Sequence, residues 1–207
     1  MRSPQQFESL IADSRRRYME SVGAEVWTAE PVTVEEAELL FRGFESKLIV
    51  FDNDDGRLRL EAFAPHPNTG TKSYQLFGNY RKSAYWMWRE MFIQIGFGIE
   101  LVLDWNWPAH LVAFETKGFD IVAAPAAPTI MAEAKVKAED LDEQFRVFSE
   151  YGKGGSQTNA NRYVDLKTHQ PSMYAAVALG TRRYYEIKQL DESLRFNRVP
   201  EPIAHSA

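Results

Sequence analysis

The stretch that decides the fold reads GFDIVAAPAAPTIMAEAK and runs from Gly118 to Lys135. Its two apolar runs are typical of strands, and the segment PAAP between them favours a reversal of the chain. A hairpin whose turn is centred on the two alanines of PAAP places Asp120 directly opposite Glu133. The sequence therefore predicts two adjacent strands that bring two carboxylates to one point of a sheet.

Asp120, Glu133 and Lys135 form a chemically distinctive group in this arrangement. Facing Cβ atoms of an antiparallel pair lie about 4.5–5.5 Å apart, so the two carboxylates repel each other unless a cation lies between them. Lys135 lies two residues beyond Glu133 and points to the same face of the strand. Such oxygen ligands bind Mg²⁺, which polarises a phosphate, while a lysine orients or helps to deprotonate the attacking water. The pair Glu-x-Lys by itself is also typical of a solvated strand face with a local ion pair.

The spacing Asp-x12-Glu-x-Lys on consecutive strands, followed by an amphipathic helix, resembles the PD-(D/E)XK nuclease superfamily over roughly residues 80–187. The resemblance implies an α/β fold with a restriction-endonuclease-like α-β-β-β-α-β core, in which helices flank a central mixed sheet. It also implies that Asp120 and Glu133 are metal ligands and catalytic residues, that Lys135 is the catalytic lysine, and that the cofactor is Mg²⁺ or Mn²⁺. Phe119 stands where the superfamily has its name-giving proline.

Two further residues match less regular features of the same superfamily. Many members carry a glutamate on the helix before the first core strand, and Glu90 is the acidic residue of the expected helix 80–95. Some members carry a glutamine on the helix after the lysine, where Gln144 lies. The resemblance thus makes Glu90 a third metal ligand and Gln144 an accessory residue. Alternatively, Glu90 pairs with Arg89 or Lys82, and Gln144 is an ordinary helix residue.

Periodicity, capping residues and turn residues predict the remaining elements. The expected helices begin after the capping residues Ser3 and Thr33, and further helices cover 80–95, ended by Gly96 and Gly98, and 140–151. We expect a hairpin around the turn 52–56, strands at 99–104, 110–115, 119–123, 129–136, 174–180 and 184–187, and a loop at 152–171. This order divides the chain into an N-terminal extension of helices and a β-hairpin packed on the core (1–79), a nuclease-like core (80–190) and a C-terminal tail (191–207).

Charge is distributed unevenly along the chain. The net charge of −5 argues against a protein that coats nucleic acid with its whole surface. Residues 151–189, however, contain six basic and two acidic residues. We expect contacts to a phosphate backbone from the basic residues of this segment, with the loop 152–156 free to close over the substrate: Lys153, Arg162, Lys167, Arg182 and Arg183. The alternative is that these charges are dispersed and only solubilise the protein.

Aromatic residues suggest two places where nucleobases could stack. The run YWMW at 85–88 resembles a stacking platform, but bulky residues at consecutive positions more often indicate burial. Trp105 and Trp107, next to Pro108, are the better candidates for exposed rings. The sequence therefore favours stacking at this second pair.

Together these features predict a Mg²⁺-dependent nuclease that hydrolyses phosphodiester bonds of nucleic acid, with DNA as the expected substrate. The absence of cysteine excludes disulfides and thiolate metal sites, and the four histidines lack zinc-site spacing. No apolar run reaches the roughly 20 residues of a membrane span, so we expect a cytoplasmic protein without membrane contact and leave a homodimer or a larger complex open. The competing prediction is a non-catalytic module on the same fold that binds nucleic acid or another protein. A hydrolase of other phosphoesters is a third prediction.

Overall fold

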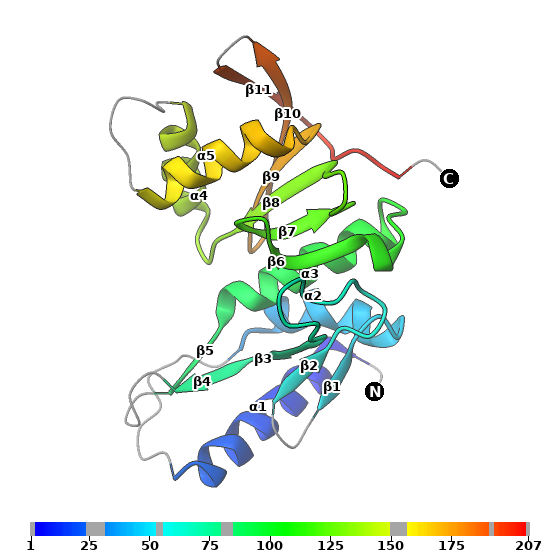
Figure 1. Ribbon diagram of the computed structural model, residues 1–207. Coiled ribbons are helices and arrows are strands. Elements are labelled where there is room, and N and C mark those ends of the chain that lie inside the picture. Colours follow the sequence, from blue (N-terminus) through cyan, green and yellow to red (C-terminus); the bar gives the residue numbers. More distant parts are fainter. Residues whose placement is uncertain are drawn as a thin grey trace.

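The computed structural model describes residues 3–23, 32–52, 56–79, 85–149, 157–190 and 193–205. In this part of the chain a six-stranded mixed sheet carries helices on both faces, which confirms the predicted α/β class (Figure 1). The helices are α1 (Pro4–Ser21), α2 (Val34–Glu45), α3 (Arg89–Leu103), α4 (Ala138–Ser149), α5 (Gln157–His169) and the short 3-10 helix η1 (Ala109–Leu111). The strands are β1 (Val50–Asp52), β2 (Arg57–Arg59), β3 (Ser73–Gln75), β4 (Phe77–Asn79), β5 (Tyr85–Met87), β6 (Val112–Thr116), β7 (Phe119–Ala123), β8 (Ile130–Ala134), β9 (Met173–Ala178), β10 (Thr181–Leu190) and β11 (Ser193–Val199).

The six-stranded sheet has the strand order β11-β10-β9-β8-β7-β6. Its neighbouring strands are antiparallel except for β8 and β9, which are parallel and therefore need a crossover connection. Helices α4 and α5 form that crossover, so most of the predicted loop at 152–171 is wrong. Residues 157–169 form α5 because Tyr163 and Leu166 are buried against the sheet. The predicted closing loop at 152–156 lies outside the described residues.

Apolar side chains cover both faces of this sheet. One face, which includes Ile121 and Ala132, shares an apolar cluster with α3 and the N-terminal elements. The opposite face, which includes Val122 and Met131, packs against α4 and α5. Burial on both faces explains why β8 and β9 are almost continuously apolar. A charged residue inside either strand is therefore exceptional.

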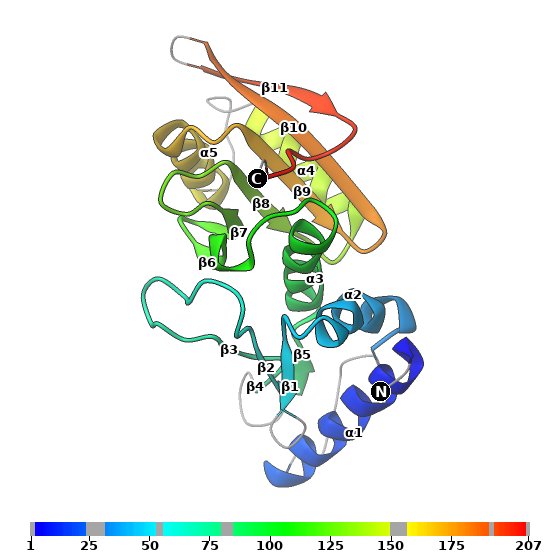
Figure 2. The ribbon, with the colours of Figure 1, turned by 90° about the vertical axis from the view of Figure 1, so that its right-hand side faces the viewer.

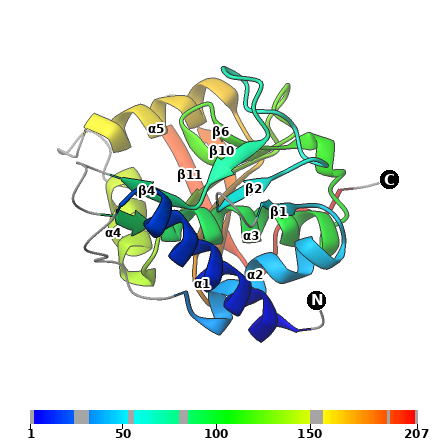
Figure 3. The ribbon, with the colours of Figure 1, turned by 90° about the horizontal axis from the view of Figure 1, so that it is seen from below.

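The N-terminal elements begin as their capping residues predict. Ser3 accepts a backbone hydrogen bond at the start of α1, and Thr33 with Glu36 forms the complete capping box of α2. Strands β1 and β2 form the predicted hairpin, which β3 extends to a small three-stranded sheet. Helix α1 packs on α2 (Figure 3). The ring centroids of Phe7 and Phe44 lie 5.3 Å apart. Helix α3 lies between most of these elements and the large sheet (Figure 1). Tyr74 of β3 also contacts Phe114 of β6 directly, with ring centroids 6.1 Å apart.

The predicted helix over 80–95 is confirmed for 89–95 and wrong for 85–88, whereas 80–84 lie outside the described residues. The predicted strand over 99–104 is wrong. Residues 85–87 form β5, and α3 then runs without interruption from Arg89 to Leu103. Gly96 and Gly98 lie inside this helix. Glycine is needed at both positions because the neighbouring elements leave no room for a side chain. A Cβ atom on Gly96 would lie 2.7 Å from Leu39 of α2, and one on Gly98 would lie 2.5 Å from the ring of Phe114 in β6. In the described ranges, no helix is long and apolar enough to cross a membrane.

The predicted C-terminal tail contributes to the fold. Its first described part is β11, which pairs with β10 as a long ribbon at one edge of the sheet (Figure 2). Farther on, the carbonyl of Ile203 accepts a hydrogen bond from Trp107 Nε1 at 2.9 Å, and His205 N donates to the Trp105 carbonyl at 2.9 Å. Trp107 is 4% exposed. The expectation of an exposed stacking ring at Trp107 is therefore wrong.

Candidate active site

The hairpin of β7 and β8 has the register that the sequence predicts. Ile121 pairs with Ala132 and Val122 with Met131, so Asp120 and Glu133 occupy the facing positions just beyond the last pair. At this point the ladder opens, and Ala134 N donates a 2.7 Å hydrogen bond to Asp120 Oδ2 instead of to a backbone carbonyl. This bond fixes the Asp120 carboxylate beside the end of β8.

Glu133 is the centre of the site and has no exposed surface. Gln144 Nε2 of α4 donates a 3.1 Å hydrogen bond to Glu133 Oε2. Arg162 Nε of α5 lies 2.5 Å from Glu133 Oε1, an ion pair without hydrogen-bond geometry. The crossover helices therefore converge on this carboxylate, and the structure places Gln144 and Arg162 in the same site.

Lys135 connects Glu133 to the start of α3. Its Nζ atom lies 3.5 Å from Glu133 Oε2 and 3.5 Å from Glu90 Oε1, and it donates a 2.6 Å hydrogen bond to the Ala134 carbonyl. Glu90 belongs to the first turn of α3, and its side chain is 51% exposed. The site thus extends from a buried carboxylate through one ammonium group to a solvent-accessible carboxylate.

Burial dominates the electrostatics of the two facing carboxylates. Burial and the negative charge of Asp120 raise the pKa of Glu133 to about 8, although Arg162, Lys135 and Gln144 favour its ionised form. Burial also raises the pKa of Asp120, and the hydrogen bond from Ala134 N opposes that rise. Both carboxylates are therefore destabilised in their charged form, and additional positive charge at the site would relieve this.

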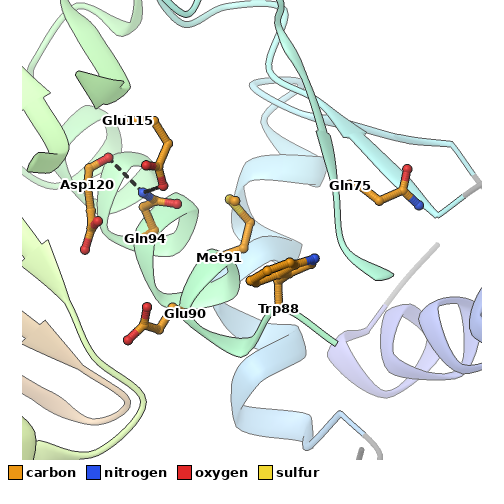
Figure 4. Close-up of a pocket in the computed structure, with 7 residues that line it drawn as sticks. All are labelled: Gln75, Trp88, Glu90, Met91, Gln94, Glu115 and Asp120. Atoms are coloured by element: carbon orange, nitrogen blue, oxygen red, sulfur yellow. Dashed lines mark hydrogen bonds between the residues drawn. The ribbon is translucent and has the colours of Figure 1, made fainter. Parts of the chain in front are cut away.

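A pocket of about 340 Å³ opens beside Asp120 (Figure 4). Its lining comes from β3, β6, β7 and the start of α3: Gln75, Trp88, Glu90, Met91, Gln94, Glu115 and Asp120. Gln94 Nε2 donates at 2.6 Å to Glu115 Oε1 and at 2.9 Å to the Asp120 carbonyl, and Figure 4 shows it between these two residues. Three carboxylates thus line one cavity.

Glu115 is a site residue that the sequence reasoning missed. The pairs Phe114–Ile121 and Thr116–Phe119 flank it, so Glu115 faces Asp120 across the β6–β7 hairpin. Its backbone has a φ of 51°, a left-handed conformation that costs a non-glycine residue about 1–3 kcal/mol and is concentrated at functional sites. The turn of this hairpin consists of Lys117 and Gly118, which both have positive φ. Recognising this two-residue turn would have predicted the pair, because counting outward from it pairs Glu115 with Asp120.

Of the basic residues expected to contact a phosphate backbone, the three arginines do not lie together. Arg162 reaches into the site, whereas Arg182 donates to Glu100 Oε2 at 2.8 Å on the α3 face of the sheet. Arg183 pairs with Asp142 of α4 on the opposite face, as alternation along β10 requires. Lys167 lies on α5, and Lys153 is outside the described residues.

The oxygen atoms around Glu133 suit a hard cation. Among the described residues, no group of three or more His, Cys, Asp or Glu side chains is arranged to hold a metal ion by itself. Mg²⁺, however, usually takes one or two carboxylates and completes its coordination with water and substrate phosphate, a requirement that Asp120 and Glu133 meet. The buried Oε1 atoms of Glu133 and Gln144 also have no hydrogen-bond partner within the described ranges. The donor set therefore fits Mg²⁺ or Mn²⁺.

The chain matches no protein-family model, no curated protein and no solved structure.

Proposed function

We propose that the protein is a metal-dependent nuclease that hydrolyses phosphodiester bonds of nucleic acid, with DNA as the expected substrate. The observation that carries the proposal is that the partly buried Asp120 and the fully buried Glu133 lie at the adjoining ends of β7 and β8, with Lys135 Nζ 3.5 Å from Glu133 Oε2. A buried carboxylate beside a second, partly buried one is costly, and a site that served only folding would be at least as stable with neutral side chains. A cation bound there during function explains why both acids are present.

The order of elements supports the same proposal. Helix α3, the antiparallel strands β6, β7 and β8, helix α4 and the parallel strand β9 follow one another as α-β-β-β-α-β. This is the order implied by the resemblance to the PD-(D/E)XK superfamily, and the Asp, Glu and Lys lie on its second and third strands and just beyond. Helix α5 is an addition within the crossover. The N-terminal elements are an addition that contributes Gln75 to the pocket.

Each residue of the site has a chemical role in this proposal. Asp120 and Glu133 would hold Mg²⁺ or Mn²⁺, whose chemistry is to polarise the phosphate. Lys135 donates one N–H to the Ala134 carbonyl. An ammonium group has two more N–H donors, with which it would orient the attacking water. Glu90 fixes the position of that ammonium group from the solvent side. Gln144 orients Glu133 through its hydrogen bond.

One observation favours the alternative of a non-catalytic module that binds nucleic acid or another protein. Arg162 already supplies a positive charge to Glu133, at 2.5 Å, and Lys135 supplies a second. If these two cations permanently compensate the negative charge of Glu133, the cluster only stabilises the crossover between β8 and β9 and needs no metal ion. The two functions therefore differ in whether a divalent cation binds at Glu133.

The experiment that separates them is cleavage of DNA and RNA in Mg²⁺ or Mn²⁺, with and without a chelator. Asp120→Asn is the informative variant because the amide oxygen still accepts the hydrogen bond from Ala134 N while the charge is lost. We expect cleavage in the wild type, none with chelator, and a loss of at least about 100-fold in the variant. Calorimetry with Mn²⁺ should show binding to the wild type and not to Asp120→Asn.

Asp140→Asn is the matched control, because Asp140 is exposed in the first turn of α4. It should cleave like the wild type. A folded wild type that binds nucleic acid but neither cleaves it nor binds Mn²⁺ would establish the non-catalytic alternative. Activity confined to small phosphodiesters would assign the site to another class of hydrolase.

A further inference from the structure

Arg162 lies where a metal ion at Glu133 would bind. Its Nε atom is 2.5 Å from Glu133 Oε1, whereas Gln144 and Lys135 contact the other oxygen, Oε2, at 3.1 and 3.5 Å. A Mg²⁺ ion lies about 2.0–2.1 Å from a carboxylate ligand, so an ion on Oε1 and this guanidinium group need the same space. Their positive charges also repel each other, most strongly where burial excludes water. A metal ion can therefore bind Oε1 only if Arg162 moves away.

The contacts of Arg162 are weaker than those of Arg182, the other arginine that pairs with a glutamate beside the sheet. The approach of Arg162 to Glu133 lacks hydrogen-bond geometry, and the same Nε atom donates a long bond of 3.4 Å to the Gly118 carbonyl. Arg182 Nε, by comparison, donates at 2.8 Å to Glu100 Oε2. The Arg162 side chain is also 20% exposed, which gives it a path to solvent. Arg162 is therefore able to exchange partners.

A second carboxylate lies beside Arg162 on the same helix. Asp165 follows Arg162 by three residues in α5, and side chains at this spacing are neighbours on a helix surface. A Cβ atom on Gly118 would lie 2.5 Å from Asp165 Oδ2, so this carboxylate lies against the turn whose carbonyl Arg162 contacts. Burial raises the pKa of Asp165, and the positive charges of His169 and Arg162 oppose that rise. Asp165 is thus placed to accept the guanidinium group.

We infer that Arg162 gates the metal site: it pairs with Glu133 when no metal ion is bound and turns to Asp165 when one binds. The inference rests on the proposed function, since the metal ion is the one proposed at Glu133. It adds a regulation of that site, because the affinity for metal is set by competition with this side chain. The helix itself stays in place, since Tyr163 and Leu166 anchor α5 to the sheet. The ion pair that favoured a non-catalytic module is then the closed state of the site.

The test is calorimetric titration with Mg²⁺ at pH 8.5, above the pKa of about 8 of Glu133, so that protons compete little with the metal ion. Arg162→Gln should bind Mg²⁺ about 10- to 100-fold more tightly than the wild type, the range for loss of one charged partner of a buried carboxylate. Arg162→Lys keeps the positive charge and should stay close to the wild type. Asp165→Asn should bind about 2- to 5-fold more weakly, because the displaced guanidinium group loses its second partner.

The double variant of Arg162→Gln and Asp165→Asn tests whether Asp165 acts through Arg162. If it does, Asp165→Asn has no effect on Mg²⁺ affinity once Arg162 is replaced, whereas a direct attraction between Asp165 and the metal ion would persist. Arg146→Gln is the matched control. It removes one positive charge from the exposed side of α4, where Arg146 pairs with Glu143 at 2.7 Å, and should bind Mg²⁺ like the wild type.

Equal or weaker Mg²⁺ binding by Arg162→Gln than by a wild type that binds the ion, with both proteins folded by circular dichroism, would overturn the gate and leave the metal site. An effect of Asp165→Asn that persists in the double variant would overturn Asp165 as the second partner. Cleavage of DNA in Mg²⁺ is measured in parallel. Tighter binding by Arg162→Gln without cleavage by any of the proteins leaves the gated metal site and removes the nuclease. Absence of Mg²⁺ binding in both the wild type and Arg162→Gln removes the gate and the proposed function together.

Discussion

Two clusters built around a glutamate lie on opposite faces of the sheet, and α3 contributes to both. Near the C-terminal end of α3, Glu100 accepts hydrogen bonds from Arg182 Nε at 2.8 Å and from the Tyr184 hydroxyl at 3.1 Å. At the other end, Glu90 approaches Lys135, which in turn approaches Glu133. Both clusters combine carboxylates with cationic side chains, and they differ in how completely the positive charges balance the negative ones.

The Glu100 cluster is balanced, with one carboxylate, one guanidinium and one hydroxyl. The side chains of Glu100 and Arg182 are about one-fifth exposed, and Arg182 also donates to the Ala178 carbonyl at 2.6 Å. In the other cluster Glu133 has no exposed surface and faces a second carboxylate. Its buried Oε1 atom lies 2.5 Å from Arg162 Nε but has no hydrogen bond within the described ranges. The first cluster therefore pairs its one carboxylate with one guanidinium, whereas the second has three carboxylates (Asp120, Glu133 and Glu90) for two cationic groups (Lys135 and Arg162). The proposal of a bound metal ion rests on this difference.

The largest effect should come from removing the lysine of the unbalanced cluster. We expect Lys135→Ala to lower the cleavage rate by about 10²–10⁴-fold, the range for a positioned acid–base group, while the fold and Mn²⁺ binding persist. Lys188→Ala is the matched control, since Lys188 pairs with Glu186 on the exposed end of β10. Rates from a time course of DNA cleavage measure the difference. Full activity of Lys135→Ala removes the lysine from the mechanism.

The second effect is a pH dependence of stability. The folded-state pKa of Glu133, about 8, exceeds the ordinary value of 4.5, so the folded protein binds a proton that the unfolded chain releases between these pH values. The free energy of unfolding should therefore fall as the pH rises from about 5 to 8, by at most about 1.4 kcal/mol per unit. Urea denaturation in chelator at several pH values measures this decline.

Glu133→Gln should flatten that decline, because it removes the group that titrates. Glu100→Gln is its matched control and should leave the decline unchanged. Identical pH profiles for the wild type and Glu133→Gln would contradict the assignment of the raised pKa to Glu133.

The third effect concerns the balanced cluster. We expect Glu100→Gln to lower the free energy of unfolding by about 1–3 kcal/mol at pH 7, because Arg182 loses its charged acceptor in a largely buried place. Cleavage and Mn²⁺ binding should remain at wild-type levels. Urea denaturation and the cleavage assay together measure this separation. Loss of cleavage at wild-type stability would show that the comparison between the clusters is wrong.

The smallest effect should distinguish two adjacent arginines. Arg183 pairs with Asp142, and their side chains are 16% and 70% exposed, so Arg183→Gln should lower the free energy of unfolding by about 1 kcal/mol. If Arg183 also contacts a phosphate, the slope of log affinity against log salt, measured in Ca²⁺ to prevent cleavage, should fall by about 0.7–0.9. Arg182→Gln should leave the slope unchanged because Glu100 binds its guanidinium group. If the slope falls for Arg182→Gln and is unchanged for Arg183→Gln, then Arg182 is the residue that contacts phosphate and Arg183 is not.

The sequence predicted local structure well where a few neighbouring residues decide it. The caps at Ser3 and Thr33 and the register of β7 with β8 depend on residues close in the chain, and each is found as expected. The sequence failed where a distant neighbour decides the structure. Gly96 and Gly98 resembled a helix end, but they allow α3 to pack closely on Leu39 and Phe114.

The same distinction between local and distant determinants applies to the residues of the site. The sequence by itself determined that Asp120, Glu133 and Lys135 share one end of a hairpin, because a short turn sets the register and strand residues alternate with a period of two. Only the tertiary structure decided that Arg162 contacts Glu133, that Glu90 reaches Lys135, and that Glu115 and Trp88 line the adjoining pocket. These residues reach the site through the crossover helices, through α3 and through a second hairpin. Their positions depend on how buried apolar faces pack over long separations in the chain, which no local pattern of residues specifies.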